Sequence, residues 1–283
     1  MPVQKELNLT ERLSVVEHSR ITDIIGNLPY RMAFAGGWID QPFISVLNPT
    51  PPGAMVVVSL EPSLRFMDRC GMGTSTRNVA RQLWGNQLPA GNPANLVRQL
   101  YQAENLGKAE PSGSQDMAGL IYPGINRLDF DSNFEGGIFP VHVESCQDPQ
   151  IAQWLEEVVA MIPVNQRPEG YNPLSIKNLD SEWVRRLGQS GKDCYSAILS
   201  RDLKGLGESM NECMRCWEVL LPDTVRHPSL NLDLVEFLEV YQSCYPGAMY
   251  SGCGGGYLYV VSDDPVPGAF RIKVHVAEPV VDA

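Results

Sequence analysis

No run of apolar residues in this 283-residue chain approaches the roughly 20 that a helix needs to span a lipid bilayer. The first residues, MPVQKELNLTERL, also lack the basic-then-apolar pattern of a secretory signal peptide. We therefore expect a cytoplasmic protein with no membrane partner. Because 43% of the residues are hydrophobic and 19% are charged, we also expect an ordinary globular core.

Basic residues are few, with 22 lysines and arginines against 33 aspartates and glutamates, a formal net charge of -11. Binding to a nucleic-acid backbone requires a basic surface, so nucleic acid is not an expected partner. A small anionic ligand is compatible with this charge, because it needs only local amide groups and one or two cations. The sequence does not indicate the oligomeric state.

Cysteines are also few, seven in all, and their odd number favours a reducing compartment over a disulfide framework. Cys213 and Cys216 form a single C-x-x-C pattern. Zinc binding would require a second pair of ligands, and none stands out in the sequence. Since the spacing places both thiols on one face of a helix, we interpret them as buried helix residues, with redox chemistry as the less favoured alternative.

Periodicity and turn residues predict a chain of mixed helices and strands. Helices are expected over residues 8–27, 75–84, 92–107, 148–163, 180–220 and 227–246, with a short one after residue 113. Strands are expected near residues 30–35 and 53–62, as pairs within 126–145 and 247–261, and over 269–279. The composition changes near residue 147, which indicates two domains, 1–146 and 147–283. This mixture favours an α+β fold of two sandwiched subdomains.

Residues 71–78, GMGTSTRN, form a glycine-rich stretch immediately before a predicted helix. Gly71 and Gly73 would let the backbone approach a ligand closely, and the amides of residues 73–76 would point at an anion. The hydroxyl groups able to bind phosphate or Mg²⁺ are those of Thr74, Ser75 and Thr76. Taken alone, the stretch is better explained as an ordinary Ser/Thr helix cap.

Two more glycine-rich stretches and two carboxylates favour a ligand site. YSGCGGGYLYVV places Gly252 and the run 254–256 between two predicted strands, which is more glycine than a hairpin needs. AFAGGWIDQP places Asp40 just after a glycine pair. PSGSQDMAGL places Asp116 at a helix start, where its carboxylate either caps the helix or accepts a proton from a substrate hydroxyl.

The order of RMAFAGGWID, GMGTST, GSQDMAGLIYPGINRLDF and YSGCGGGYLYVV resembles that of the GHMP kinases, named for the galactose, homoserine, mevalonate and phosphomevalonate enzymes. The heptose 7-phosphate kinase and fucokinase branch is the most similar one, and the match covers roughly residues 29–135 and 245–262. The resemblance implies an N-terminal domain like domain 2 of ribosomal protein S5 and a C-terminal ferredoxin-like α/β sandwich. It also implies ATP and Mg²⁺ as cofactors and a sugar or sugar phosphate as substrate.

The resemblance further implies roles for individual residues. Asp116 would activate the substrate hydroxyl, while Arg31 would lower the pKa of Asp116 and neutralise charge on the transferring phosphoryl group. Glu104 would complete a Mg²⁺ site with Ser75, although a solvated helix carboxylate explains Glu104 equally well. The implied nucleotide-binding residues are Gly71, Met72, Gly73, Thr74, Ser75, Thr76, Gly254 and Gly255. The implied acceptor-binding residues are Gly36, Gly37, Trp38 and Asp40.

Four functional hypotheses follow. We favour a Mg-ATP-dependent kinase that phosphorylates a hydroxyl of a sugar or sugar phosphate. The alternative is a non-catalytic protein that senses a sugar or nucleotide; it is favoured by Arg77, where the family has a small or apolar residue, and by residues 41–70, a shorter segment than is typical. ATP-dependent decarboxylation is a third possibility, to which AGGWID is less suited. The fourth explains every glycine stretch by turn formation alone.

Overall fold

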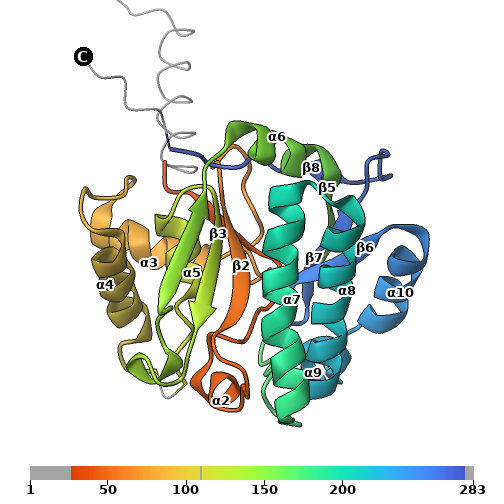
Figure 1. Ribbon diagram of the computed structural model, residues 1–283, viewed down its shortest axis with the longest axis horizontal. Coiled ribbons are helices and arrows are strands. Elements are labelled where there is room, and N and C mark those ends of the chain that lie inside the picture. The colour runs from red at the N-terminus through yellow and green to blue at the C-terminus, as the bar shows by residue number, and fades with distance from the viewer. Residues whose placement is uncertain (1–26, 109, 278–283) are drawn as a thin grey trace, which may run out of the picture.

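The computed structural model describes residues 27–108 and 110–277 as two antiparallel four-stranded sheets with surrounding helices (Figure 1). The first sheet has the order β1-β2-β3-β4 and consists of Tyr30–Ala33, Gly53–Leu60, Ile125–Phe130 and His142–Cys146. The second has the order β6-β7-β5-β8 and consists of Gly247–Gly252, Gly255–Val261, Val159–Asn165 and Phe270–Arg271. This is the predicted α+β class, whereas the helix expected over 8–27 lies outside the described residues.

The helices of the first half are α2 (Pro42–Ser45), α3 (Thr74–Trp84), α4 (Pro93–Asn105) and α5 (Gln115–Ile121), with a 3-10 turn at Glu135–Gly137. Those of the second half are α6 (Pro149–Val158), α7 (Ser181–Ser200), α8 (Leu203–Leu220), α9 (Asp223–Arg226) and α10 (Leu234–Cys244). The helices expected over 75–84 and 92–107 have nearly the predicted bounds, whereas the one expected over 180–220 is divided into α7 and α8, the one expected over 227–246 begins at Leu234, and α2 and α9 were not expected. An Asn or Asp side chain caps the N-terminus of α4, α6, α7, α8 and α10, which stabilises each helix start.

Two further sequence predictions in the second half were wrong in extent. The helix expected over 148–163 ends at Val158, and the following residues form β5 between β7 and β8. Periodicity alone does not separate a helix from a buried strand in the apolar run VVAMIPV, and pairing on both sides selects the strand. The last strand, expected over 269–279, covers only two residues before the chain crosses to pair Val274 with Leu60 of the first sheet.

Helices α7 and α8 lie side by side and pack on β2 and β6 respectively, so that this helical pair joins the two sheets (Figure 1). Glycines allow the close approach. A Cβ atom on Gly188 of α7 would lie 2.8 Å from the Cα atom of Gly53, and one on Gly207 of α8 would lie 2.7 Å from the amide nitrogen of Gly247. Both distances are too short for any side chain, so the helices contact the strand backbones directly.

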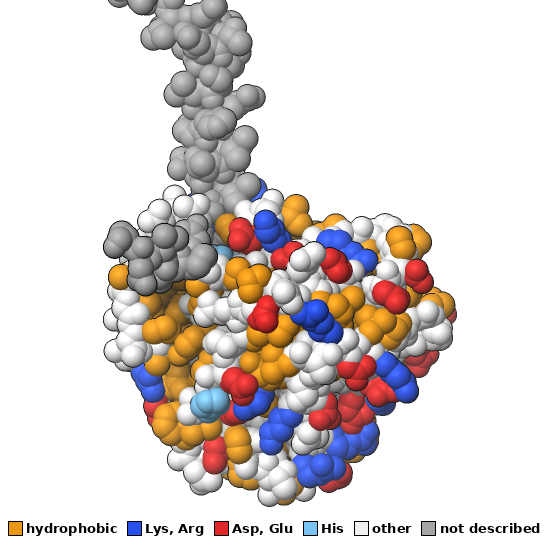
Figure 2. All heavy atoms as spheres, turned by 45° about the horizontal axis from the view of Figure 1, so that its top comes forward, with side chains coloured by type: hydrophobic (Ala, Val, Ile, Leu, Met, Phe, Trp, Pro, Cys, Tyr) orange, Lys and Arg blue, Asp and Glu red, His pale blue; other side chains and the backbone are white. Residues whose placement is uncertain are grey.

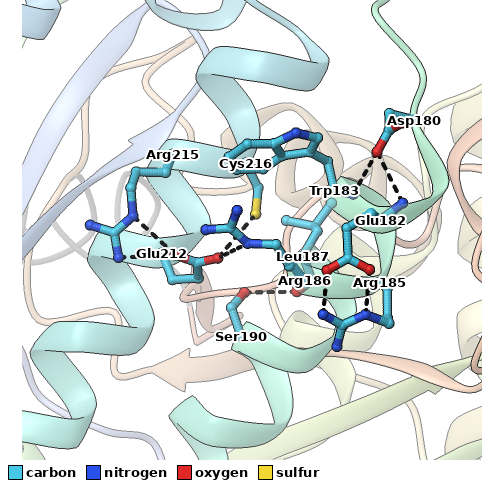
Figure 3. Close-up of polar contacts among 10 residues, drawn as sticks. All are labelled: Asp180, Glu182, Trp183, Arg185, Arg186, Leu187, Ser190, Glu212, Arg215 and Cys216. Atoms are coloured by element: carbon cyan, nitrogen blue, oxygen red, sulfur yellow. Dashed lines mark hydrogen bonds and ion pairs between the residues drawn. The ribbon is translucent and has the colours of Figure 1, made fainter.

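Polar contacts connect α7 and α8 on their outer side (Figure 3). The Nε atom of Arg186 donates to Oε1 of Glu212 at 2.6 Å, and Oε2 of Glu212 accepts from Nε of Arg215 at 3.0 Å. Cys216 faces this group, whereas the sulfur of Cys213 accepts the backbone N–H of Gly36 at 3.3 Å. Both thiols are buried, which confirms their interpretation as buried helix cysteines.

Three further observations concern the helices, the surface charges and possible metal ligands. None of the helices in the described part of the chain is long and apolar enough to cross a membrane. On the face drawn in Figure 2, acidic and basic side chains are interspersed. Within residues 27–108 and 110–277, no group of three or more His, Cys, Asp or Glu side chains is arranged to hold a metal ion.

Candidate active site

The glycine-rich loop ends at the N-terminus of α3. Gly71 and Gly73 have φ angles of +76° and +65°, in the region that glycine adopts without strain. Gly73 occupies the N-cap position, and none of the described side chains caps the first turn. Amides left uncapped at a helix start are suited to an anion. The Met72 side chain is buried and accepts the Tyr259 hydroxyl at its sulfur, so Met72 offers a ligand only its backbone.

The loop contacts the third glycine-rich stretch directly. The hydroxyl of Ser251 donates to the carbonyl oxygen of Cys70 at 2.6 Å. A Cβ atom on Gly71 would lie 2.6 Å from the carbonyl carbon of Ser251, and one on Gly252 would lie 3.0 Å from the Cα atom of Gly71. The expected packing of these two stretches is present, and it depends on backbone contact that excludes side chains.

Gly254 and Gly255 occupy the turn beyond this contact. The amide of Gly254 donates to the carbonyl of Thr224 at 2.7 Å, and the ring of Tyr171 lies against the same glycine. The side chain of Asn165 lies against Gly255 and donates to the carbonyl of Gly254 at 3.0 Å. Neither glycine lines the cavities described below, so the structure places both in the support of the turn.

Asp116, in the first turn of α5, forms an ion pair with Arg31 of β1. The Nη1 atom of Arg31 also donates to the carbonyl of Gly71 at 3.1 Å, and Oδ2 of Asp116 accepts from Thr76 Oγ1 at 3.4 Å. Burial lowers the pKa of Arg31 to about 10, which leaves its guanidinium protonated at neutral pH. Arg31 thus connects the carboxylate to the glycine-rich loop.

A cavity of about 280 Å³, hereafter the first cavity, opens beside this ion pair. Its lining includes Arg31, Gly37, Trp38, Gly71, Asp116, Arg167 and Trp217. The rings of Trp38 and Trp217 meet edge to face at 6.5 Å between centroids, and Trp217 Nε1 donates to the carbonyl of Gly37 at 3.1 Å. A largely apolar lining with a few charged groups is typical of small-molecule sites.

Asp40 is fully buried next to the first cavity and lines a neighbouring cavity of about 270 Å³. Its Oδ2 atom has no hydrogen-bond partner among the described residues, and its carboxyl leaves no room for a Cβ atom on Gly113. Burial raises the pKa of Asp40 to about 6, although backbone hydrogen bonds and the charge of Arg31 oppose the shift. Gly36, by contrast, packs on the backbone of β2 and lines none of these cavities.

A separate cavity of about 300 Å³, hereafter the second cavity, begins at Thr74 of the same loop and shares no lining residue with the first. Its lining is polar and consists of Tyr30, Arg65, Phe66, Asp68, Thr74, Arg77, Asn78 and Arg81. The guanidinium of Arg77 lies 4.2 Å from the ring centroid of Tyr30, and its Nε donates to the carbonyl of Leu28 at 3.0 Å. The glycine-rich loop therefore borders two cavities.

Glu104 and Ser75, the residues implied for Mg²⁺, differ in exposure. Glu104 is buried on α4, which excludes the solvated-carboxylate explanation. Its Oε1 atom accepts from Lys108 at 3.3 Å, while Oε2 is buried and has no hydrogen-bond partner in the described part of the chain. Burial lowers the pKa of Arg31, and the negative charge of Glu104 is among the influences that oppose this shift. Glu104 is therefore near the Arg31–Asp116 ion pair. Ser75 is exposed in the first turn of α3.

The sequence did not point to two residues of the first cavity, Arg167 and Trp217. Arg167 follows β5 in a loop with no recognisable pattern, and Trp217 lies on α8 in a generic helical repeat. In the sequence, Arg167 stands out only as a cationic residue and Trp217 only as a large aromatic one, both far from the glycine motifs. Tertiary packing alone brings them to the site.

No model of a known protein family and no curated protein sequence matches the chain. Solved structures do match. The galactokinase of Lactococcus lactis complexed with galactose is 11% identical, covering 93% of this chain and 98% of that chain with a TM-score of 0.60. The Methanococcus jannaschii mevalonate kinase is 10% identical, covering 88% and 97%, with a TM-score of 0.54. A D-glycero-D-manno-heptose 1-phosphate kinase from Bacteriodes thetaiotaomicron is 13% identical, covering 88% and 96%, with a TM-score of 0.51. At these identities the likeness shows a shared fold.

Proposed function

We propose that this chain, which has the fold of the GHMP kinases, is a Mg-ATP-dependent kinase that phosphorylates a hydroxyl of a sugar or sugar phosphate. The observation that carries the proposal is the Arg31–Asp116 ion pair, which borders the first cavity and is hydrogen-bonded to the glycine-rich loop. Phosphoryl transfer requires alignment, charge neutralisation and a group that accepts the acceptor's proton. The ion pair and the loop supply these functions in one place.

Asp116 is the proposed base. It accepts the proton of the acceptor hydroxyl as that oxygen attacks the terminal phosphorus of ATP. Arg31 favours the ionised form of Asp116 and lies where negative charge builds up during transfer. Thr76 donates to the second carboxylate oxygen and so holds Asp116 in orientation. Trp38 and Gly37 of the first cavity would contact the acceptor, and Asp40 would bind its hydroxyl groups.

The glycine-rich loop would hold the phosphates of ATP. The uncapped amides at the start of α3 and the left-handed Gly71 and Gly73 fit an anion, and the second cavity would take the rest of the nucleotide. Ser75 and Glu104 would hold Mg²⁺, and the buried Oε2 atom of Glu104 supports this assignment because a cation would satisfy it. When bound, Mg²⁺ neutralises charge on the phosphates.

One observation favours the non-catalytic sensor as a second candidate. Three of the eight residues lining the second cavity are arginines, whereas nucleotide bases are usually held by apolar side chains. If the second cavity does not bind adenine, the site would still bind an anion, but ATP would not be held there to donate a phosphoryl group.

Calorimetric titration with a non-hydrolysable ATP analogue, with and without Mg²⁺, tests the proposal without any assumption about the acceptor. We expect saturable, Mg-dependent binding in the wild-type protein and much weaker Mg dependence in Ser75→Ala. A screen of sugars and sugar phosphates for ADP release then identifies the acceptor. Absence of binding by any purine nucleotide would contradict the kinase and favour the sensor.

A further inference from the structure

The first cavity contains a second guanidinium, that of Arg167, from the loop after β5. Its Nε atom is buried and lacks a hydrogen-bond partner among the described residues. None of the ion pairs within residues 27–108 and 110–277 includes Arg167. A cation that is partly removed from water without a counter-charge is unfavourable unless a ligand supplies one.

The third glycine-rich stretch is shaped around this side chain. A Cβ atom on Gly252 would lie 2.7 Å from Nη2 of Arg167, and one on Gly254 would lie 3.2 Å from its Cγ. The aliphatic part of Arg167 therefore lies along the glycine turn, and its guanidinium reaches the part of the cavity lined by Gly252 and Cys253. Of the glycines in this stretch, Gly252 is the one whose nearest neighbour is Arg167.

Four charged residues line the first cavity: Arg31, Glu110, Asp116 and Arg167. Arg31 and Asp116 form an ion pair, and Glu110 is exposed, where water screens its charge. Arg167 lies close enough to disfavour the protonated form of Arg31, so the two guanidinium groups share one region. Among the described residues of the lining, Arg167 is therefore the cation that lacks a carboxylate partner, and an anionic ligand would supply one.

We infer that Arg167 binds the phosphate group of a phosphorylated acceptor, so that the substrate class is a sugar phosphate and not a neutral sugar. The inference rests on the proposed function for the identity of the acceptor, whereas the phosphate site itself rests on the cavity. A planar guanidinium suits phosphate because it donates two parallel N–H bonds. Gly71 of the glycine-rich loop also lines this cavity, but the acceptor's phosphate is favoured over that of ATP because Arg167 shares the cavity with Trp38, Gly37 and Asp116, the residues assigned to the acceptor.

The test uses the full-length protein and inorganic phosphate as the probe. Trp38 and Trp217 line the same cavity, so their fluorescence reports binding. Arg167→Met keeps the aliphatic chain that covers the glycine turn and removes the charge, and we expect its phosphate affinity to fall about tenfold or more. Arg167→Lys should restore part of the affinity. Arg185→Ala removes an exposed arginine on α7 and should bind phosphate as the wild type does.

Two further measurements separate the possible outcomes. The affinity for a non-hydrolysable ATP analogue should be the same in Arg167→Met and the wild type; a parallel loss would assign Arg167 to the nucleotide and overturn the inference. Equal rates of ADP release with sugars and with their phosphates would overturn the inference that the acceptor is a sugar phosphate, but would still support the proposed kinase activity. Phosphate binding that depends on Arg167 without ADP release from any acceptor would support the anion site and contradict the proposed kinase. Unchanged phosphate affinity in Arg167→Met would overturn the site.

Discussion

The backbone of Gly71 lies against the carbonyl group of Ser251, so closely that a Cβ atom on Gly71 would be 2.6 Å from the carbonyl carbon. This contact joins the glycine-rich loop before α3 to the end of β6. It predicts that Gly71→Ala displaces the loop. Gly107 is the matched control, because its φ angle of +76° equals that of Gly71 while a Cβ atom on Gly107 would meet no other side chain or distant backbone atom within 4 Å.

We expect Gly107→Ala to cost about 1 kcal/mol of unfolding free energy, the penalty for a positive φ angle. Gly71→Ala should cost a further ~1–3 kcal/mol, because the contacting atoms belong to the backbone and have little room to move. Urea unfolding of both variants measures the difference, and titration with an ATP analogue shows whether the loop still binds. Equal costs in the two variants would contradict a tight contact.

Asp116→Asn should lower the turnover number of the proposed kinase by a factor of about 10² to 10⁴, because the amide does not accept the acceptor's proton. Binding of the ATP analogue should change little, since the carboxylate is assigned to the acceptor. Asp263→Asn, which removes an exposed carboxylate, serves as the control. Coupled measurement of ADP release makes the comparison, and full turnover by Asp116→Asn would exclude Asp116 as the base.

The buried Asp40 carboxyl predicts a pH dependence of stability. Its pKa is raised from 3.8 to about 6, so between these values the native state binds more protons than the unfolded state. Stability therefore falls as the pH rises through this window, and the penalty is complete above pH 6. Asp40→Asn removes the ionisation. Relative to wild type, we expect the variant to gain up to about 3 kcal/mol between pH 4 and pH 7.

Denaturant unfolding at several pH values from 4 to 8 measures this gain. Asp263→Asn again serves as the control and should follow the wild-type curve. Parallel curves for Asp40→Asn and the wild type would show that Asp40 has an ordinary pKa in the native protein.

Thiol reactivity should separate the cysteines by burial. Cys244 is the exposed cysteine of the described chain, whereas Cys213 and Cys216 are buried in α8. Burial raises the pKa of Cys213 to about 12, which keeps it in the unreactive thiol form. We expect an aromatic disulfide reagent to modify Cys244 rapidly and Cys213 only after unfolding, as identified by mass spectrometry. Cys244→Ser should lack the fast phase; rapid modification of Cys213 in the native protein would contradict its burial.

The parts of the site that sequence reasoning identified are those with local signals. A glycine that must adopt a left-handed conformation, such as Gly71 or Gly73, is visible in the sequence because few other residues occupy that position without strain. Asp116 was identifiable through the resemblance of its stretch to the catalytic loop of the GHMP kinases, because a carboxylate at a helix start is by itself equally well explained as a helix cap. Their partnership with Arg31 became a structural fact only when β1, α3 and α5 were placed together.

The parts of the site and of the fold that sequence reasoning missed depend on contacts between segments that are distant in the sequence. No local sequence pattern marks Arg167. Its proposed role in binding an anion rests on its contacts with the third glycine-rich stretch and on the lack of a counter-charge for it in the described structure. The end of α6 at Val158 could not be predicted from a local pattern either, because the apolar residues that follow it are compatible with a helix or with a buried strand. Pairing with β7 and β8 selects the strand, and a local pattern does not contain that information.

The glycine contacts of α7 and α8 also bear on how a ligand gains access. These helices touch the backbones of β2 and β6 respectively with no side chains between them, so each helix is expected to move together with its own sheet. A displacement of one sheet relative to the other would therefore require α7 to slide against α8, against which it packs along its length. Movement that admits and releases small molecules is left to short surface segments, of which residues 110–113 border both the first cavity and its neighbour at Asp40.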